Sequence, residues 1–333
     1  MTADPLLSVR GLRVQFALRG ATLFAPPRQL AAVDDVSFEL QAGETLGIVG
    51  ESGCGKSTLG RALLRLLPAT AGQIVWLGRD LMPLAEPAVR PLRRDFQIIF
   101  QDPLAALDPR MTVGDIVAEP LVTFEPGLPP SEVRSRVRDM LGKVGLSPEM
   151  LNRYPHEFSG GQCQRIGIAR AMILRPRLIV CDEPVSALDV SIQAQIINLL
   201  AALQREFGLA LICISHNLAV VRHLSHRVMV LYLGRVVEIA PRSRLFAAPR
   251  HPYTQALLAA APSPDPRRER TKPRLSLSGD PPSPLDPPSG CAFRTRCRWA
   301  SEICAQERPT LRDDGDERAW QVACHHWEEI RSP

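Results

Sequence analysis

The stretch TLGIVGESGCGKST, residues 45–58, decides the fold. Residues 45–49 form an apolar run of the length of a buried strand. The letters GESGCGKS follow in the spacing G-x-x-x-x-G-K-S, which is the pattern of a phosphate-binding loop that ends on Lys56 and Ser57. Glycines let backbone N–H groups face phosphate oxygens, and a following helix adds its positive N-terminal end. The stretch therefore predicts a strand, a loop and a helix that bind a nucleoside triphosphate.

The residues after the loop support this interpretation. Leu59, Leu63, Leu66 and Leu67 recur at helical spacing and predict a helix that Pro68 stops. The alternative is a chance glycine-rich loop, which the strand before it and the helix after it disfavour.

Length and composition set the outer limits. The chain has 333 residues, enough for one large or two ordinary domains, and 45% of them are apolar. No apolar run approaches the roughly 20 residues of a membrane span, and no signal peptide is evident, so we expect a cytosolic protein. The net charge of +5 is mild, and no basic run is interleaved with aromatic residues, which disfavours nucleic-acid binding.

Strands that alternate with helices predict a mainly parallel sheet covered by helices. The predicted strands span residues 6–16, 31–40, 73–77, 96–100, 178–181 and 209–214. A proline-containing loop around Pro26 and Pro27 joins the first two strands. Phe16, on the first strand, is a candidate for stacking a purine base, although an ordinary core phenylalanine is an equal alternative.

Polar residues follow three of these strands. Gln101, the pair Asp182-Glu183 and His216 each come at or just past a strand end. Ligands of parallel sheets bind at this edge. Asp182 is suited to hold a Mg²⁺ ion through water, and Glu183 is suited to polarise the attacking water. Gln101 can contact the metal and the γ-phosphate, and His216 can donate a hydrogen bond to the γ-phosphate. Taken alone, the acidic pair also fits a strand-end turn, and the histidine fits a surface residue.

A second glycine motif, Ser159-Gly160-Gly161-Gln162, opens a helix with Ser159 at the N-cap. Together with the loop, Gln101, the acidic pair, SALD at residues 186–189 and His216, it resembles the ATP-binding-cassette ATPases over about residues 6–245. The resemblance implies an α/β P-loop NTPase fold with a RecA-like core, an antiparallel β subdomain, a helical subdomain at about residues 105–175 and a C-terminal cysteine-containing extension. It also implies a head-to-tail dimer in which the Ser159 helix caps the γ-phosphate held by the other subunit's Lys56.

The resemblance implies a full set of site residues. Glu183, His216 and Gln101 are the expected catalytic residues, and Ser57, Gln101 and Asp182 are the expected Mg²⁺ site. The expected nucleotide contacts are Phe16, Gly50, Glu51, Ser52, Gly53, Cys54, Gly55, Lys56, Ser57, Thr58, Gln101, Asp182, Ser159, Gly160, Gly161, Gln162 and Asp189.

Longer segments narrow the resemblance. RYPHEFSGGQCQRIGIARA (residues 153–171), DEPVSALDVSIQAQI (182–196) and HPYTQAL (251–257) are similar to the oligopeptide/dipeptide permease ATPases, and most similar to their F-type subunits. This implies an ATPase at the cytosolic face of the inner membrane that powers peptide import. Its expected partners are a D-type ATPase, two membrane subunits and an external binding protein, without nucleic acid.

Other functions stay open. Nickel, glutathione and sugar importers share this ATPase type. A soluble cassette that acts on nucleic acid or ribosomes would carry two cassettes or a long coiled coil, and this chain has one SGGQ motif and no sustained heptads. A regulatory module that holds ATP without turnover is disfavoured by the presence of Glu183 and His216.

The C-terminal part differs in composition. Residues 1–245 are the expected nucleotide-binding domain, and residues 246–333 are the expected extension, with a proline-rich linker at 262–288. Its four cysteines have the spacing C-x₅-C-x₆-C-x₁₉-C, namely Cys291, Cys297, Cys304 and Cys324. The spacing matches no common zinc or ferredoxin pattern, but four thiolates suit a metal. Related permease ATPases resemble this chain in carrying a 4Fe–4S cluster on such a quartet; zinc, free thiols or a disulfide are the alternatives.

Overall fold

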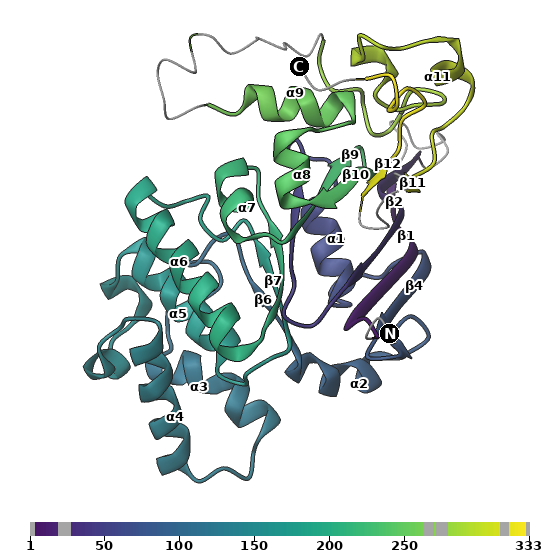
Figure 1. Cartoon of the computed structure of the whole chain (residues 1–333). Helices are drawn as coiled ribbons and strands as arrows, with labels where there is room; N and C mark the ends of the chain where they lie inside the picture. The colour runs from purple at the N-terminus through teal and green to yellow at the C-terminus, as the bar shows by residue number, and fades with distance from the viewer. Residues whose placement is uncertain (1–3, 19–27, 263–269, 271–278, 314–319, 331–333) are drawn as a thin grey trace. The chain divides into compact units, whose positions relative to one another are not determined.

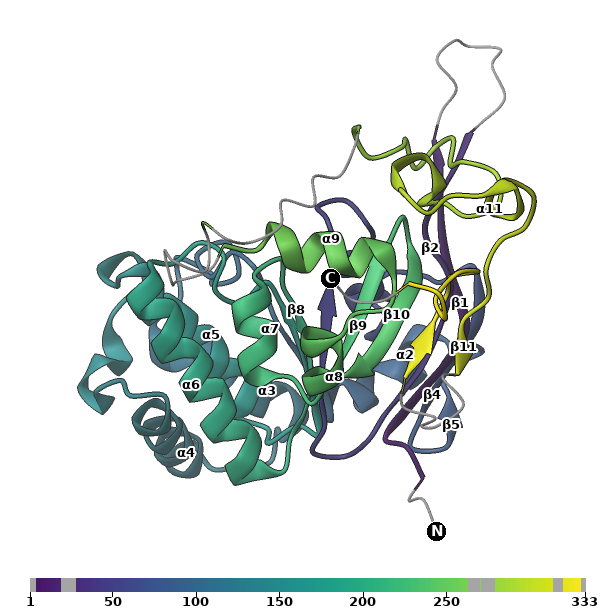
Figure 2. The ribbon, with the colours of Figure 1, turned by 45° about the horizontal axis from the view of Figure 1, so that its top comes forward.

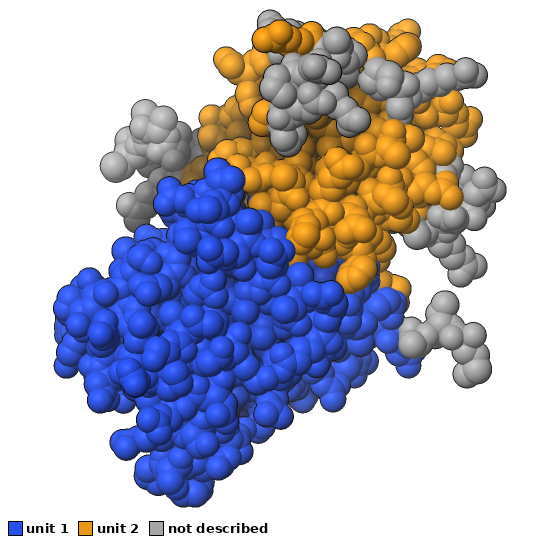
Figure 3. All heavy atoms as spheres, turned by 60° about the vertical axis from the view of Figure 1, so that its left-hand side comes forward, with its two compact units in different colours: residues 1–7, 40–45, 76–215 blue, residues 8–39, 46–75, 216–333 orange. Residues whose placement is uncertain are grey.

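The computed structural model describes residues 4–18, 28–262, 270, 279–313 and 320–330. The chain divides into two compact units, which Figure 3 colours separately. Unit 1 comprises residues 1–7, 40–45 and 76–215, and unit 2 comprises residues 8–39, 46–75 and 216–333. The predicted loop around Pro26 and Pro27, and most of the predicted proline-rich linker, lie outside the described residues.

Unit 1 is built on three parallel strands, as the alternating pattern predicted. The strand β7 (Leu178–Asp182) pairs on one side with β6 (Phe96–Ile99) and on the other with β8 (Ala210–Ile214). Every residue of β7 and β8 is buried, which explains why these strands are continuous apolar runs without alternation. In the register, Ile99 is opposite Cys181, and Asp182 is opposite Ile214.

Helices form most of the rest of unit 1. In Figure 1, α3 (Val113–Phe124) packs against α4 (Pro130–Lys143) and α5 (Gly160–Met172), and α5 also contacts α6 (Val190–Phe207). Thr112 caps α3 by accepting a hydrogen bond from the Asp115 N–H at 3.2 Å. The shorter elements are β5 (Arg79–Asp80), α2 (Glu86–Val89) and the 3₁₀ turns η1 (Arg90–Arg94), η2 (Pro148–Asn152) and η3 (Pro155–Glu157).

Unit 2 contains the strand that leads into the phosphate-binding loop. This strand, β3 (Thr45–Val49), starts at the boundary between the units and pairs in parallel with β9 (Arg227–Tyr232). The next strand, β10 (Arg235–Pro241), is antiparallel to β9. The strands β2 (Arg28–Leu40), β1 (Leu7–Leu18) and β4 (Ala71–Trp76) are neighbours in this order in a further sheet. The helices are α1 (Lys56–Leu63), α7 (Leu218–Leu224), α8 (Arg242–Ala247) and α9 (Pro252–Ala260).

The helix α1 is shorter than the leucine spacing predicted. It ends at Leu63, and Arg65 follows with a left-handed backbone (φ +54°). The N–H groups of Arg65 and Leu66 bond to the carbonyls of Ala62 and Arg61, both at 2.9 Å, which closes the helix in a Schellman motif. The prediction of a helix that continues to Pro68 is therefore wrong, and the side chain of Leu66 is exposed.

The C-terminal residues join the core of unit 2. Phe293, Trp320 and Val322 are buried in one cluster with Tyr232 and Tyr253. The strand β12 (Gln321–Val322) extends the sheet by pairing antiparallel with β10 and with β11 (Arg312–Asp313). The turn η4 (Arg294–Arg296) and the helix α11 (Glu302–Gln306) also belong to this part, in which Figure 2 labels β11 and α11. The extension thus shares a core with the strands that carry the phosphate-binding loop.

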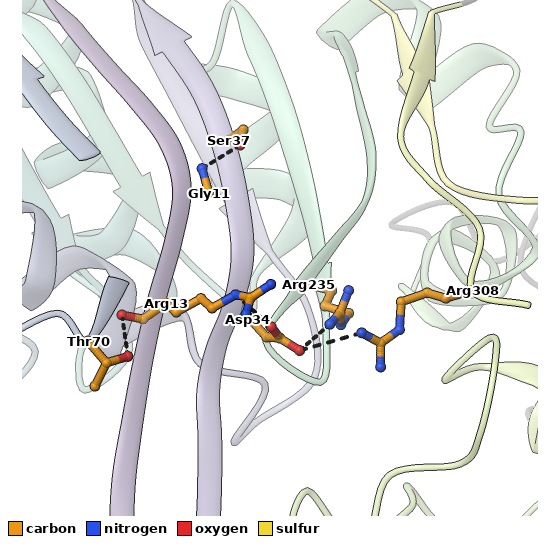
Figure 4. A network of polar contacts seen from close by, with 7 residues as sticks. All are labelled: Gly11, Arg13, Asp34, Ser37, Thr70, Arg235 and Arg308. Carbon is orange, nitrogen blue, oxygen red and sulfur yellow. Dashed lines mark hydrogen bonds and ion pairs between the residues drawn. The ribbon is translucent and has the colours of Figure 1, made fainter. Parts of the chain in front are cut away.

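An ion-pair network adds a polar contact to this packing (Figure 4). Asp34 of β2 pairs with Arg235 of β10, with Arg13 at 3.5 Å and with Arg308 at 3.9 Å. Arg308 comes from the extension, and the other three residues come from strands of the same unit.

Among the described residues, no helix has the length and apolar character needed to cross a bilayer.

Candidate functional site

The phosphate-binding loop lies between Val49, the last residue of β3, and Lys56, the first residue of α1. Gly55 is the N-cap of α1 and has a left-handed backbone (φ +100°). A Cβ atom at this position would lie 2.0 Å from the carbonyl oxygen of Ala32. Only glycine satisfies both conditions, which gives the predicted motif a steric reason.

The side chain of Lys56 folds back over its own loop. Its Nζ donates hydrogen bonds to the carbonyl oxygens of Gly50 at 2.8 Å and Glu51 at 2.9 Å, and it lies 3.7 Å from the Cys54 Sγ. Lys56 is 5% exposed. The ammonium group is thus held inside the loop at the positive end of α1, which is a suitable place to meet a phosphate.

Cys54 points inward from the loop. Its side chain is buried, and burial raises the pKa of its thiol although the nearby Lys56 lowers it. A contact from Cys54 to a phosphate would therefore come from its backbone.

Three predicted site residues, the catalytic candidates Gln101 and Glu183 and the magnesium candidate Asp182, lie in unit 1. Asp182 ends β7 with its side chain buried, and Glu183 follows directly. The Nε2 of Gln101, two residues past the end of β6, donates a hydrogen bond to the Glu183 Oε2 at 3.0 Å. Because β6 and β7 are parallel neighbours, their carboxyl ends meet at one edge.

Glu183 has an unusual backbone. Its φ angle is +49°, in the left-handed region that a residue with a side chain seldom occupies. Its N–H donates to the Ile214 carbonyl at 2.9 Å, which holds this conformation against β8. Strained backbone of this kind clusters at functional sites.

The glycine motif opens α5 as predicted. The Ser159 Oγ accepts from the Gln162 N–H at 3.4 Å, and the Gln162 Oε1 accepts from the Ser159 N–H at 3.0 Å, which makes a capping box. A Cβ atom on Gly161 would lie 2.5 Å from the Ile192 Cγ2, so this glycine allows α5 and α6 to approach. Ser159 and Gly160 are exposed, and Asp189 is the exposed N-cap residue of α6.

Two other predicted residues belong to unit 2. His216 is exposed and precedes Asn217, which caps α7 by accepting from the Ala219 N–H at 3.0 Å. Phe16 lies on β1 and is half-buried, so it is not a fully enclosed core residue.

The cysteine quartet gathers around one small cavity. The cavity has a volume of about 10 Å³, room for one water-sized sphere. Its lining includes Cys291, Cys297, Cys304, Cys324, His251, His325 and His326. Burial raises the pKa of the Cys291 and Cys297 thiols, and raises that of Cys324 to about 12.

The geometry of this cavity bears on the predicted metal. Among the described residues, no group of three or more His, Cys, Asp or Glu side chains is arranged to hold a metal ion. Binding of a single ion or of an iron–sulfur cluster there would require these side chains to rearrange. Either would also require the thiols to lose their protons.

The sequence interpretation missed three interactions at the loop. The Glu51 N–H donates to the Tyr253 Oη at 2.8 Å, and the Glu51 carboxylate pairs with the Arg296 guanidinium through two hydrogen bonds of 2.8 and 3.0 Å. The third is the bond from Lys56 to the Glu51 carbonyl. The residues around Glu51 contain no pattern that predicts Tyr253 and Arg296 as partners, because both lie more than 200 positions away in the chain.

Comparison with known proteins agrees with this geometry. The family model described as "ABC transporter" matches residues 33–186, and the model described as "Oligopeptide/dipeptide transporter, C-terminal region" matches residues 237–304. The oligopeptide transport ATP-binding protein OppF of Salmonella typhimurium is 58% identical over 92% of each chain, and that of Escherichia coli is 57% identical over 92% of each chain.

Solved structures give the same fold. A dimeric, post-hydrolysis ATP-binding cassette bound to ADP and phosphate has a TM-score of 0.64 and 28% identity, covering 71% of this chain and 98% of its own. The cbiO1 protein of Clostridium perfringens, part of an ABC transporter complex, has a TM-score of 0.63 and 27% identity, covering 73% and 91%. The chain therefore belongs to the ABC transporter ATPases of the oligopeptide/dipeptide permease family.

Proposed function

We propose that this chain is the ATP-hydrolysing subunit of an ABC importer that takes up oligopeptides or dipeptides. The observation that carries the proposal is the similarity to oligopeptide transport ATPases across both the cassette and the C-terminal region. The hydrogen bond between Gln101 and Glu183 at a strand edge supports the hydrolytic role.

In this proposal the phosphate loop holds the phosphates of the nucleotide. Lys56 contacts the β- and γ-phosphates, while the backbone of residues 50–58 supplies N–H donors. Ser57, Gln101 and, through water, Asp182 would hold Mg²⁺, which would neutralise charge on the phosphates. Phe16 stacks on the adenine base.

Glu183 is the proposed general base. Its carboxylate accepts a proton from the attacking water, and Gln101, already bonded to it, orients the carboxylate. His216 donates a hydrogen bond to the γ-phosphate. The strained backbone of Glu183 is consistent with a position selected for chemistry.

The Ser159 motif, residues 159–162, acts at the nucleotide site of the partner ATPase subunit. Residues 159–162 and Asp189 contact the γ-phosphate that the partner ATPase subunit holds, and ATP thereby joins the two subunits head to tail. The exposed N-terminus of α5 favours an anion, which supports this role.

The proposed partners follow from the family. They are a second, D-type ATPase subunit, two transmembrane permease subunits and an external substrate-binding protein. The chain would then work as a peripheral protein at the cytoplasmic face of the inner membrane.

The cysteine quartet is a proposed metal site with either a 4Fe–4S cluster or Zn²⁺. The support is the gathering of all four cysteines around one cavity. Metal analysis and the absorbance of anaerobically purified protein near about 400 nm separate the two metals. Replacing Cys291 and Cys297 by serine should abolish the metal content, while wild-type protein that carries neither iron nor zinc contradicts the proposal.

Purification of the tagged chain from detergent-solubilised membranes tests the function. We expect ATP turnover together with two multi-span subunits and a second cassette ATPase. An associated binding protein for nickel, glutathione or a sugar would change the cargo and keep the ATPase role. Recovery only from the soluble fraction, with ribosomes or DNA, would contradict the transporter.

A further inference from the structure

Glu51 is the point where the phosphate-binding loop meets the C-terminal third of the chain. Its carbonyl oxygen accepts from the Lys56 Nζ at 2.9 Å. Its N–H donates to the Tyr253 Oη at 2.8 Å, and its carboxylate accepts two hydrogen bonds from Arg296. The N–H, the carbonyl oxygen and the carboxylate of Glu51 are thus all hydrogen-bonded, and the carbonyl oxygen is bonded to Lys56 of the phosphate-binding loop.

The two distant partners are both buried. Tyr253, on α9, is fully buried, and the side chain of Arg296, on η4, is 5% exposed. The Phe293 ring packs at 5.5 Å from the Tyr253 ring and at 5.3 Å from the Tyr232 ring. A planar guanidinium that binds a carboxylate through two bonds in such surroundings fixes direction as well as distance.

We propose that Arg296 is a positioning residue for nucleotide binding, which acts through Glu51 to hold the phosphate loop and Lys56 in their binding geometry. The C-terminal extension is then part of the nucleotide site's support and not only an appendage. This inference rests on the proposed binding of ATP at the loop.

A comparison within the chain separates this role from simple packing. Arg308 is a second arginine of the extension that pairs with an aspartate, at 3.9 Å from Asp34. Its side chain is 49% exposed, and Asp34 lies on β2, outside the phosphate-binding loop. Both pairs join the extension to other parts of unit 2, but of the two it is the Arg296 pair that ends on the phosphate-binding loop.

The experiment is a titration of ATP against the purified full chain and its variants. Arg296→Gln should bind ATP roughly tenfold more weakly, the order expected when a charged, paired hydrogen bond that shapes the loop is lost. Arg296→Lys keeps the positive charge but cannot make the paired hydrogen bonds, so its ATP affinity should lie between those of wild type and Arg296→Gln. Arg308→Gln is the matched control and should bind within about twofold of wild type.

A double-mutant cycle tests the route through Glu51. The double variant Glu51→Gln/Arg296→Gln should bind ATP no more weakly than the single variant with the lower ATP affinity, because both substitutions remove the same contact. Additive losses would overturn the route, and an Arg296→Gln protein that binds ATP like wild type would overturn the inference.

Two further measurements distinguish a failure of the positioning role from a failure to fold and from a failure of the proposed function. If Arg296→Gln fails to fold, Arg296→Lys decides: an unchanged ATP affinity in the folded Lys variant contradicts the proposal, and a weakened one supports it. Wild-type protein that does not bind ATP would contradict the proposed function itself, whereas ATP-binding wild type with an unaffected Arg296→Gln contradicts only the positioning role.

Discussion

At the scale of single residues, Glu183 combines an unfavourable backbone with the side chain that we propose as the general base. The left-handed conformation costs an L-residue roughly 1–2 kcal/mol. Among the hydrogen bonds that hold the residue there, one runs from its N–H to the Ile214 carbonyl and another from Gln101 to its carboxylate. The first bond sets the backbone, and the second aims the carboxylate.

Replacing Glu183 by glutamine should keep ATP binding and lower the rate of hydrolysis by at least about a hundredfold, because an amide cannot accept the proton of the attacking water. The amide oxygen can still accept the Gln101 bond, so the local fold should be kept. Steady-state phosphate release and size-exclusion chromatography with ATP measure the rate and the trapped dimer.

Glu206→Gln is the control for this prediction. Glu206 pairs with Lys143, and its side chain is 48% exposed, so its replacement should leave turnover unchanged. Turnover by Glu183→Gln at the wild-type rate would refute the general-base role.

At the scale of elements, the short strand β12 is held by more than its two pairings with β10. The Trp320 Nε1 donates to the Glu238 Oε1 at 3.0 Å, and the same carboxylate accepts from the N–H groups of Arg250 and His251, both at 3.0 Å. Burial raises the pKa of Glu238, and these bonds partly offset that rise. A completely buried carboxyl group thus joins β10, the start of α9 and the extension.

Trp320→Phe should lower the free energy of unfolding by about 1–3 kcal/mol, because it removes one hydrogen bond from a buried acceptor and keeps an aromatic ring. Urea unfolding followed by circular dichroism measures the change. Trp299→Phe is the control, since Trp299 is exposed, and it should change the stability little. Equal stabilities of the two variants would show that the Glu238 contact contributes nothing.

At the scale of the whole molecule, a buried histidine makes stability depend on pH. His251 is 1% exposed, and its Nδ1 accepts from the Tyr253 N–H at 3.0 Å. Burial lowers the pKa of His251 to about 3. The unfolded chain takes up this proton near pH 6.5, whereas the folded chain resists it until about pH 3.

The stability of wild type should therefore fall as the pH drops below about 6.5, by up to about 1.4 kcal/mol per pH unit from this residue. His251→Gln should remove this part of the slope. Unfolding curves at pH 7.5 and 5 test the difference between the two proteins, so that other titrating groups cancel. His223→Gln, at an exposed histidine, should keep the wild-type slope, and an identical slope in His251→Gln would contradict the prediction.

Much of the local structure could be predicted from the sequence. The buried strands β3, β7 and β8 appear as apolar runs, and Ser159 and its Gln162 mark the start of α5. The same reasoning placed Gln101 and Glu183 at strand ends on one edge of the sheet, and the structure shows that the two side chains are hydrogen-bonded. These features are encoded locally, because strand burial, helix capping and loop glycines depend on residues within a few positions of each other.

The sequence by itself determined the strand, loop and helix of the phosphate site and the family motifs that surround it. Only the tertiary structure decided where α1 ends, since the Schellman motif at Arg65 and Leu66 overrides the leucine spacing. It alone also brought Arg296 and Tyr253 to Glu51, across 245 and 202 positions of the chain. The physical reason is that periodicity records which face of an element is buried, whereas the partner on that face depends on how distant side chains pack in one core.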